Sequence, residues 1–288
     1  MSIIIDHLSY KYKDALEDED YALKDINLKI EDGEFLGIIG HTGSGKSTLI
    51  QHLNGLERAT DGHIYYNGED IYDTDFDMRK LRAKVGVVFQ YPEYQLFEST
   101  VFKDISFGPK NLGLPQLEVD LRSYQAMRDV GLSEEIIDLS PLALSGGQKR
   151  RVAIAGVLAM EPEVLILDEP TAGLDPKGRK EILELLKKLH KERKCTIILV
   201  SHSREDVATY TERLVVMHEG RIVLDGKTRE VFSFEKELGM MGLAVPQVTT
   251  IMNRLKEKGV AVRGNVLTVE EAKEEILKNI LMKNNISH

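Results

Sequence analysis

The residues at positions 40–47, Gly-His-Thr-Gly-Ser-Gly-Lys-Ser, have the types and the spacing of a loop that binds phosphate groups. Glycine lets the backbone curl around an anion, so that successive N–H groups point at phosphate oxygens. Lys46 adds a full positive charge for the β- and γ-phosphates, and Ser47 adds a hydroxyl ligand for Mg²⁺. The predicted nucleotide-binding residues are Gly40, His41, Thr42, Gly43, Ser44, Gly45, Lys46, Ser47 and Thr48.

Two elements must position this loop. The apolar run at 35–39 predicts a buried strand before it, and residues 47–53 predict a helix after it. The N-terminus of a helix carries roughly half a positive charge, which favours a bound phosphate. The alternative is a glycine-rich turn that matches by accident, and the strand–loop–helix context disfavours it.

A pair of carboxylates, Asp168 and Glu169, follows the apolar run at 164–167. A strand that ends in this way can place Asp168 near Mg²⁺ and Glu169 near the γ-phosphate. Paired carboxylates at a strand end are also compatible with a solvated turn. The presence of a phosphate loop in the same chain favours metal and water chemistry.

A second glycine-rich segment is formed by Leu144, Ser145, Gly146, Gly147 and Gln148, and it precedes a helix predicted over 149–160. Such an entry lets an anion approach the exposed N–H groups at the positive end of the helix. Capping of the helix by Ser145 is the simpler interpretation, but a cap does not require two glycines. Two separate phosphate-contacting surfaces on one chain indicate that two chains share each nucleotide.

The composition limits the class of protein. The chain has 288 residues, 42% hydrophobic and 30% charged, which suits one large α/β domain with a small appendage. The net charge of −9 gives no broad basic surface, so we expect no nucleic-acid partner. Cys195 cannot form a disulfide within the chain, and we expect a small core residue there. We found no targeting sequence and no apolar run close to 18 residues, so a membrane role requires a partner.

The remaining patterns predict a nucleotide-binding core with added parts. Strands are predicted at 3–10, 23–30, 63–66, 85–89, 164–167, 196–200, 214–217 and 221–224, with an acidic loop at 14–20. The expected fold is α/β: a mostly parallel sheet with helices on both faces and an antiparallel β subdomain. A compact helical subdomain is expected at about 92–143, with Pro109 among its interruptions. We place the main domain at 1–232 and a helical extension at 233–288, with a capping box of Thr268 and Glu271.

Together these segments resemble the ABC-type ATPase family. The resemblance covers residues 3–230, with Walker A at 40–47, a Q-loop at Gln90, the signature at 144–148 and Walker B ending at Asp168-Glu169. A D-loop at 172–175 and a switch histidine at His202 complete the set. The resemblance implies a P-loop NTPase core and a head-to-tail dimer that sandwiches two ATP between Walker A of one chain and the signature of the other.

The resemblance also implies a role for each matching residue. Ser47 and Gln90 would ligate Mg²⁺, and Asp168 would hold it through water. Glu169 would orient and deprotonate the attacking water, His202 would contact the γ-phosphate, and Asp175 would touch the opposing subunit. Tyr12 is the candidate that stacks on adenine; Tyr10 and Tyr21 are competing candidates.

The residues in and around these motifs resemble those of the ATPases of energy-coupling factor importers. Thr42 and the segment Glu169-Pro170-Thr171 resemble the second type of these ATPases. This implies a second ATPase chain, with a heterodimer favoured over a homodimer, a transmembrane coupling subunit and a membrane substrate-binding subunit. It also implies a peripheral position on the cytoplasmic face of the cell membrane, uptake of vitamins or transition-metal ions, and a dimer contact in the extension. The alternatives are the ATPase of a conventional binding-protein-dependent importer and a clamp on nucleic acid; the short stretch between Gln90 and Ser145 disfavours the clamp.

A surface for the membrane subunit is expected directly after Gln90. Residues 92–97 mix apolar side chains with Glu93, and Glu98 follows. We interpret them as the lip of a groove for a helix that has an apolar side and an arginine. The alternative is an ordinary surface turn.

Overall fold

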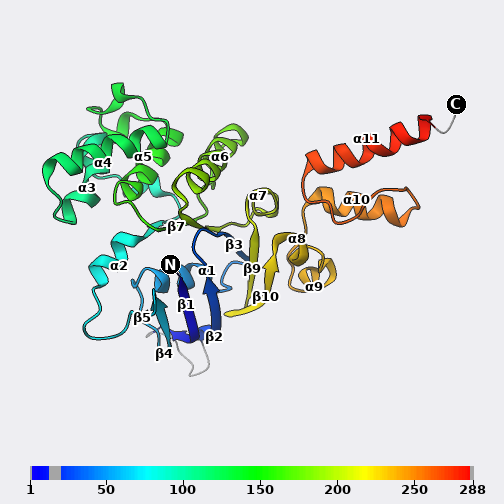
Figure 1. The fold of residues 1–288 in the computed structure, drawn as a ribbon, viewed down its shortest axis with the longest axis horizontal. Coiled ribbons are helices and arrows are strands. Elements are labelled where there is room, and N and C mark those ends of the chain that lie inside the picture. Colours follow the sequence, from blue (N-terminus) through cyan, green and yellow to red (C-terminus); the bar gives the residue numbers. More distant parts are fainter. Residues whose placement is uncertain (1, 13–20, 286–288) are drawn as a thin grey trace.

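The computed structural model describes residues 2–12 and 21–285, so the acidic loop expected at 14–20 lies outside the described residues. Its centre is a sheet of six strands (Figure 1). The strand order is β10 (Arg221–Lys227), β9 (Arg213–His218), β3 (Phe35–Gly40), β8 (Thr196–Val200), β7 (Val164–Asp168), β6 (Val85–Val88). All neighbours are parallel except β9 and β10, which pair antiparallel across a tight turn. The predicted mostly parallel sheet is confirmed.

A second, antiparallel sheet flanks the first. It contains β2 (Tyr21–Ile30), β1 (Ile3–Lys11), β4 (Asp61–Tyr66) and β5 (Glu69–Asp70), in that order. Asn67 and Gly68 join β4 to β5 with φ of 54° and 86°, as expected for an Asn-Gly hairpin turn. The structure thus contains the antiparallel β layer that the turn signals predicted.

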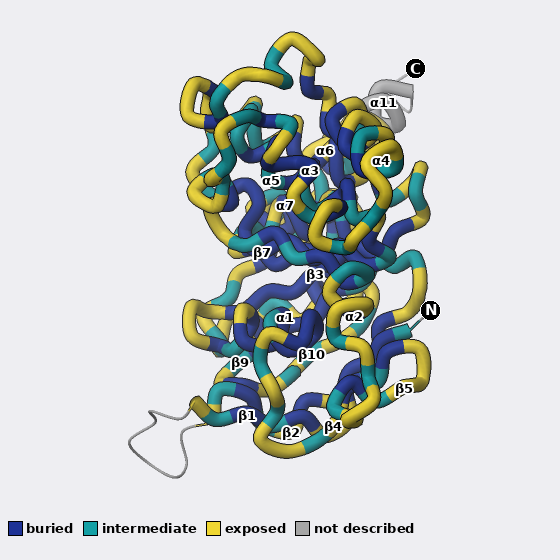
Figure 2. Tube along the Cα trace, turned by 90° about the vertical axis from the view of Figure 1, so that its left-hand side faces the viewer, coloured by how far each residue is buried: buried dark blue, intermediate teal, exposed yellow. Residues whose placement is uncertain are grey.

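Side chains alternate between two cores along the central strands. In β7, Val164 and Ile166 face a core shared with the antiparallel sheet, whereas Leu165 and Leu167 face the other side. Helix α1 (Lys46–Leu53) buries Leu49, Ile50 and Leu53 in the first of these cores. The opposite core is covered by the helices α5 (Gly146–Leu158), α6 (Pro176–Arg193) and α7 (Arg204–Tyr210). Figure 2 shows the buried residues concentrated around β3, β7 and α1.

The helical subdomain projects from one side of the central sheet (Figure 1). After helix α2 (Met78–Lys84) and the 3₁₀ turn η1 (Pro92–Gln95) it contains α3 (Val101–Asn111) and α4 (Gln116–Asp129). The 3₁₀ turns η2 (Glu134–Ile136) and η3 (Pro141–Ala143) lead to α5. The expectation that Pro109 interrupts the helix is wrong, because α3 continues through it for two residues. Proline lacks only the N–H that would donate to the carbonyl of Ile105, so one hydrogen bond of the helix is lost there.

After β10, the described part of the chain continues into helices on the side away from the helical subdomain (Figure 1). They are α8 (Thr228–Val231), α9 (Glu235–Met240), α10 (Gln247–Glu257) and α11 (Val269–Asn285). The last two share a small core of Met252, Val262, Val266 and Ala272. Thr268 Oγ1 accepts from Glu271 N at 3.2 Å, but the Glu271 carboxylate accepts from Leu267 N instead of completing the box. None of the described helices is long and apolar enough to cross a membrane.

Candidate nucleotide-binding and catalytic site

The phosphate loop connects β3 to α1 and requires glycine at specific positions. Gly43 and Gly45 have φ of 81° and 100°, in the left-handed region that side chains rarely adopt. A Cβ on Gly45 would lie 2.7 Å from the carbonyl oxygen of Ala22 on β2. A Cβ on Gly43 would meet no described atom within 4 Å, so this side of the loop is open to a ligand.

Lys46 is buried inside the loop. Its Nζ donates hydrogen bonds to the carbonyl oxygens of Gly40 at 2.8 Å and His41 at 2.7 Å. Burial lowers the pKa of Lys46, while the carboxylates of Glu169 and Asp168 act in the opposite direction. The ammonium group is therefore held at the centre of the loop, where it can transfer its hydrogen bonds to phosphate oxygens.

Ser47 and Asp168, two of the three residues predicted to hold Mg²⁺, are in direct contact. Ser47 Oγ donates to Asp168 Oδ2 at 2.9 Å. Burial raises the pKa of Asp168, and the hydrogen bond from Ser47 opposes this effect. Hydroxyl and carboxylate oxygens are hard ligands that suit Mg²⁺, which also retains water and substrate phosphates. The described residues contain no cluster of three or more His, Cys, Asp or Glu side chains that could hold a metal alone.

Glu169 follows β7 with φ of 49°, a left-handed conformation that is unusual for glutamate. Its N–H donates to the carbonyl of Val200 on β8 at 3.0 Å. Its Oε1 is buried and has no hydrogen-bond donor among the described residues; Nε2 of His202 lies 3.6 Å away. Burial raises the pKa of Glu169 to about 7, and the Asp168 carboxylate adds to the increase. A buried carboxylate oxygen without a donor is suited to accept a proton from water.

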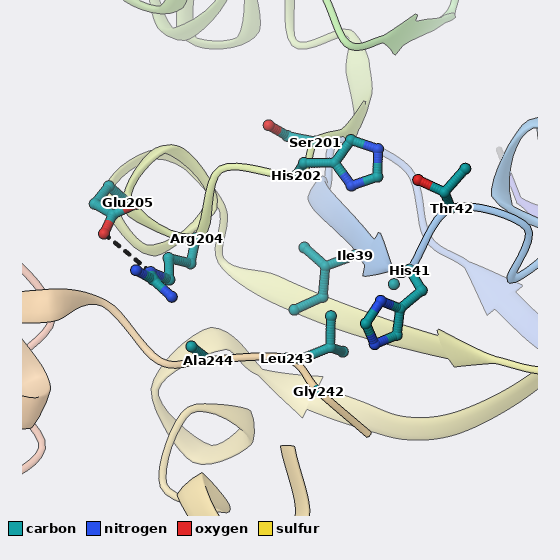
Figure 3. A pocket seen from close by; sticks show the side chains of 11 residues that line it. Ile39, His41, Thr42, Ser201, His202, Arg204, Glu205, Gly242, Leu243 and Ala244 are labelled. Atoms are coloured by element: carbon teal, nitrogen blue, oxygen red, sulfur yellow. Dashed lines mark hydrogen bonds and ion pairs between the residues drawn. The ribbon is translucent and has the colours of Figure 1, made fainter. Parts of the chain in front are cut away.

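His202 and Gln90 lie at the same edge of the central sheet. His202 follows β8, and burial lowers the pKa of its half-exposed imidazole. It faces the phosphate loop across a pocket of about 360 Å³ (Figure 3). Gln90 is exposed just after β6, whose Val88 is in register with Leu167 of β7. The carboxyl ends of these parallel strands form the crevice in which α/β folds bind ligands.

The three tyrosine candidates for adenine stacking differ in exposure. Tyr12 is 45% exposed, and its hydroxyl lies 2.9 Å from Thr48 Oγ1 at the start of α1. Tyr10 is buried and donates to Glu57 Oε2 at 2.7 Å, so its ring faces cannot receive a base. Tyr21 is exposed on β2, opposite Lys11. Tyr12 combines exposure with a contact to the helix that carries the phosphate loop.

The signature segment begins α5. Ser145 Oγ accepts from Gln148 N at 3.3 Å, and Gln148 Oε1 accepts from Ser145 N at 3.0 Å, which completes a capping box. Leu144 is buried beneath it. A Cβ on Gly146 or on Gly147 would meet no described atom within 4 Å. Capping and an open glycine face therefore coexist, so capping by Ser145 does not exclude an anion-binding role for this segment.

Asp175 and Cys195 occupy defined structural positions. Asp175 is exposed and caps α6, because its Oδ1 accepts from Gly178 N at 2.7 Å. Cys195 is buried, as the sequence predicts, and burial raises the pKa of its thiol to about 11. The thiolate is therefore not available for reaction at neutral pH.

The expectation that Glu93 is free to receive an arginine from a partner is wrong. Its carboxylate forms a bidentate ion pair with Arg150 of α5, at 2.7 Å and 3.1 Å. Arg150 Nη1 also donates to the carbonyls of Pro170 and Ala172, after Walker B. Sequence reasoning missed Arg150, because nothing in the pattern of α5 distinguishes it from the neighbouring Lys149 and Arg151.

Comparisons with known proteins agree with this geometry. The family model described as ABC transporter matches residues 23–172. The energy-coupling factor transporter ATP-binding protein EcfA2 of Caldanaerobacter subterraneus is 55% identical over 99% of this chain and 100% of its own length. EcfA2 of Clostridium tetani is 58% identical over 96% of this chain and 97% of its own.

Solved structures give the same result. CbiO1 from Clostridium perfringens, described as part of the ABC transporter complex cbiONQ, aligns with a TM-score of 0.74 and 42% identity over 89% of this chain and 96% of its own. The cassette MJ0796, solved as a dimer with ADP and Pi, aligns with a TM-score of 0.68 and 31% identity over 78% and 98%. The chain therefore belongs to the ABC transporter ATPases and, within them, to the energy-coupling factor transporter ATP-binding proteins.

Proposed function

We propose that this ATP-hydrolysing subunit works as one half of a head-to-tail dimer, preferably with a related but different ATPase chain. The dimer binds two ATP at its interface and drives uptake of vitamins or transition-metal ions through separate membrane subunits. The chain then lies on the cytoplasmic face of the membrane. The observation that carries this proposal is the pair of open glycine segments on different elements of one chain: Gly43 before α1, and Gly146 and Gly147 at the start of α5.

Each chemical role that ATP hydrolysis requires has a candidate residue in the proposed site. Lys46 transfers its hydrogen bonds from loop carbonyls to phosphate oxygens, and Tyr12 stacks on adenine. Ser47, Gln90 and Asp168 hold Mg²⁺, which when bound neutralises charge on the phosphates. Glu169 accepts the proton of the attacking water, and a pKa of about 7 suits a general base near neutral pH.

The remaining residues contact the γ-phosphate or the partner chain. His202 contacts the γ-phosphate. The signature residues 144–148 contact the ATP held by the partner chain, and Asp175 contacts the surface of that chain. The exposure of Asp175 and the absence of described atoms over Gly146 and Gly147 support this assignment.

An apolar groove on the helical subdomain is the proposed binding surface for the membrane coupling subunit. It has a volume of about 590 Å³, and its apolar lining includes Leu96, Phe97, Phe107, Leu112 and Met160. Phe97 and Phe107 contact edge to face with their ring centroids 4.9 Å apart, and both are exposed. Exposed apolar surface of this kind is typical of a groove that receives an amphipathic helix.

Purification of the intact membrane complex tests the proposal. We expect this chain to co-purify with a second ATPase and with transmembrane subunits, and to support ATP-dependent uptake in liposomes. Lys46→Ala should weaken ATP binding about 10–100-fold, because it removes a charged donor to phosphate. Lys191→Ala, an exposed lysine of α6, should leave ATP binding unchanged. Unaltered ATP affinity in Lys46→Ala would contradict the assignment of the site.

A further inference from the structure

The phosphate loop contacts the C-terminal extension through the side chain of His41. The ring Nε2 of His41 is hydrogen-bonded to the carbonyl oxygen of Met241, which lies 200 residues further along the chain. A carbonyl can only accept, so Nε2 carries the hydrogen and donates it. Figure 3 shows His41 pointing at the segment 242–244 across the pocket beside the loop.

The helix end explains why this carbonyl is available. Helix α9 ends in a Schellman motif: Leu243 N donates to Leu238 O at 2.8 Å and Gly242 N donates to Gly239 O at 2.9 Å. Gly242 has the left-handed φ of 64° that this motif requires. The carbonyl of Met241 is one of the last of the helix and has no acceptor role inside it. His41 supplies the missing donor.

The accepting segment is fixed to the main domain. Leu238 is fully buried and Val245 is 3% exposed, and both belong to the core on the α5–α7 side of the central sheet. Met241 and Leu243 pack against the same core. The carbonyl that receives the hydrogen bond is therefore a rigid point and not part of a loose tail.

The extension also contacts the segment that carries the switch histidine. Gln247 N, at the start of α10, donates to Glu205 Oε1 at 3.5 Å. Glu205 lies on α7, three residues after His202. The segment 241–247 therefore contacts both of the segments that flank the pocket in Figure 3.

Inside the loop, the backbone of His41 is part of the phosphate site. Its carbonyl accepts from Lys46 Nζ at 2.7 Å and from Ser44 N at 3.1 Å. We propose that His41 is a positioning residue through which the C-terminal extension fixes the phosphate loop for ATP binding. The inference rests on the nucleotide site proposed above. Because coupling between two binding events is reciprocal, the extension stabilises the ATP-bound loop, and bound ATP stabilises the docked extension.

Three variants of the full chain test this role in ATP titrations and in turnover measurements. His41→Ala should raise the dissociation constant and the KM for ATP about three- to tenfold, the range expected for one lost hydrogen bond. The kcat at saturating ATP should change by less than about twofold, because the chemical groups remain in place. His41→Gln should restore most of the affinity, because its amide can donate to the same carbonyl.

Gly242→Ala tests the other side of the contact. The Cβ of the new alanine would lie 2.9 Å from His41 Nε2. The left-handed φ of this position is also unfavourable for alanine. The substitution should weaken ATP binding in the parent chain, but not further in a His41→Ala background, because the two changes break one contact. His63→Ala is the matched control: His63 is an exposed histidine on β4 that pairs with Asp70.

Amide hydrogen exchange tests whether the effect of His41 reaches the C-terminal extension. If His41 acted only within the phosphate loop, its substitution would not alter the effect of ATP on exchange over 238–247. We expect ATP to slow exchange over 238–247 in the parent chain and in His41→Gln, and not in His41→Ala. If His41→Ala binds ATP as tightly as the parent and ATP slows its exchange over 238–247 as in the parent, while Lys46→Ala loses affinity, this inference alone is overturned. Unchanged affinity in Lys46→Ala would instead overturn the nucleotide site on which it rests.

Discussion

Arg150 and Glu93 form a bidentate ion pair between the signature helix α5 and the 3₁₀ turn that follows the Q-loop. Arg150 is 1% exposed, and its guanidinium also donates to the carbonyls of Pro170 at 2.9 Å and Ala172 at 2.8 Å. A buried guanidinium needs all of these acceptors, because an unpaired buried charge is strongly unfavourable. One side chain therefore joins the signature helix, the Q-loop turn and the segment after Walker B.

Glu93→Ala should destabilise the protein, because it leaves the buried Arg150 without its carboxylate. We expect a loss of about 2–3 kcal/mol in the free energy of unfolding, near the low end for a broken buried pair because Glu93 is partly exposed. Urea unfolding followed by circular dichroism measures the effect. Glu98→Ala keeps the backbone N–H that donates to Asp104 and should be close to neutral. Equal stability of Glu93→Ala and the parent would contradict the structural role of the pair.

Glu169→Gln should bind ATP as tightly as the parent and hydrolyse it about 10²–10⁴-fold more slowly, the usual cost of losing a general base. The amide retains the shape of the side chain but cannot take a proton from water. Phosphate release under saturating ATP gives the rate, and ATP titration gives the affinity. Glu192→Gln, at an exposed position on α6, is the control and should turn over normally. Hydrolysis by Glu169→Gln at the parental rate would remove Glu169 from the chemistry.

Burial of Glu169 should also make stability depend on pH. Its pKa is raised from 4.5 to about 7, so between these values the folded protein keeps a proton that the unfolded chain has released. This group's contribution to folding therefore becomes less favourable as pH rises through that window. At pH 8, in EDTA and without nucleotide, Glu169→Gln should be more stable than the parent by roughly 1–3 kcal/mol. The difference should disappear near pH 4.5 in the same urea titrations, and a constant difference at both pH values would contradict the assignment.

Phe97→Asp should prevent assembly with the membrane subunits and leave ATP binding by the isolated chain unchanged. The Phe97 side chain is 65% exposed beside the proposed groove, so the change costs little folding energy but places a charge on an apolar contact surface. Co-purification from membranes measures assembly. Leu117→Asp is the matched control, because Leu117 is an exposed apolar residue of α4 that does not line the groove. Normal assembly of Phe97→Asp would exclude this groove as the docking site.

The sequence was sufficient for the features that depend on local spacing. The phosphate loop, the strand before it and the helix after it follow from glycine positions and apolar runs, and the structure contains all three. Asp168, the last residue of β7, lies next to Ser47 because parallel strands end at one edge of the sheet. The roles of these residues in ATP hydrolysis stay predictions.

Contacts between distant segments could not be predicted. Glu93 looked free because the sequence does not show that Arg150 is buried beside it. The contact of His41 with Met241 is invisible for the same reason, since neither residue belongs to a periodic pattern that fixes its neighbour. Tyr10 and Tyr12 are two positions apart, so strand alternation places them on one face and cannot distinguish them; only their different burial favours Tyr12. In each case the missing information is the packing of one element on another.

The position of Arg150 has a consequence for the proposed dimer as a whole. In that dimer each chain would give its phosphate loop and Walker B to one ATP and its signature to the other, and Arg150 joins the signature helix to the segment after Walker B within a single polypeptide. Within each subunit, Arg150 then connects the residues at one ATP site with those at the other. We therefore expect ATP hydrolysis at the two sites to be coupled and not independent.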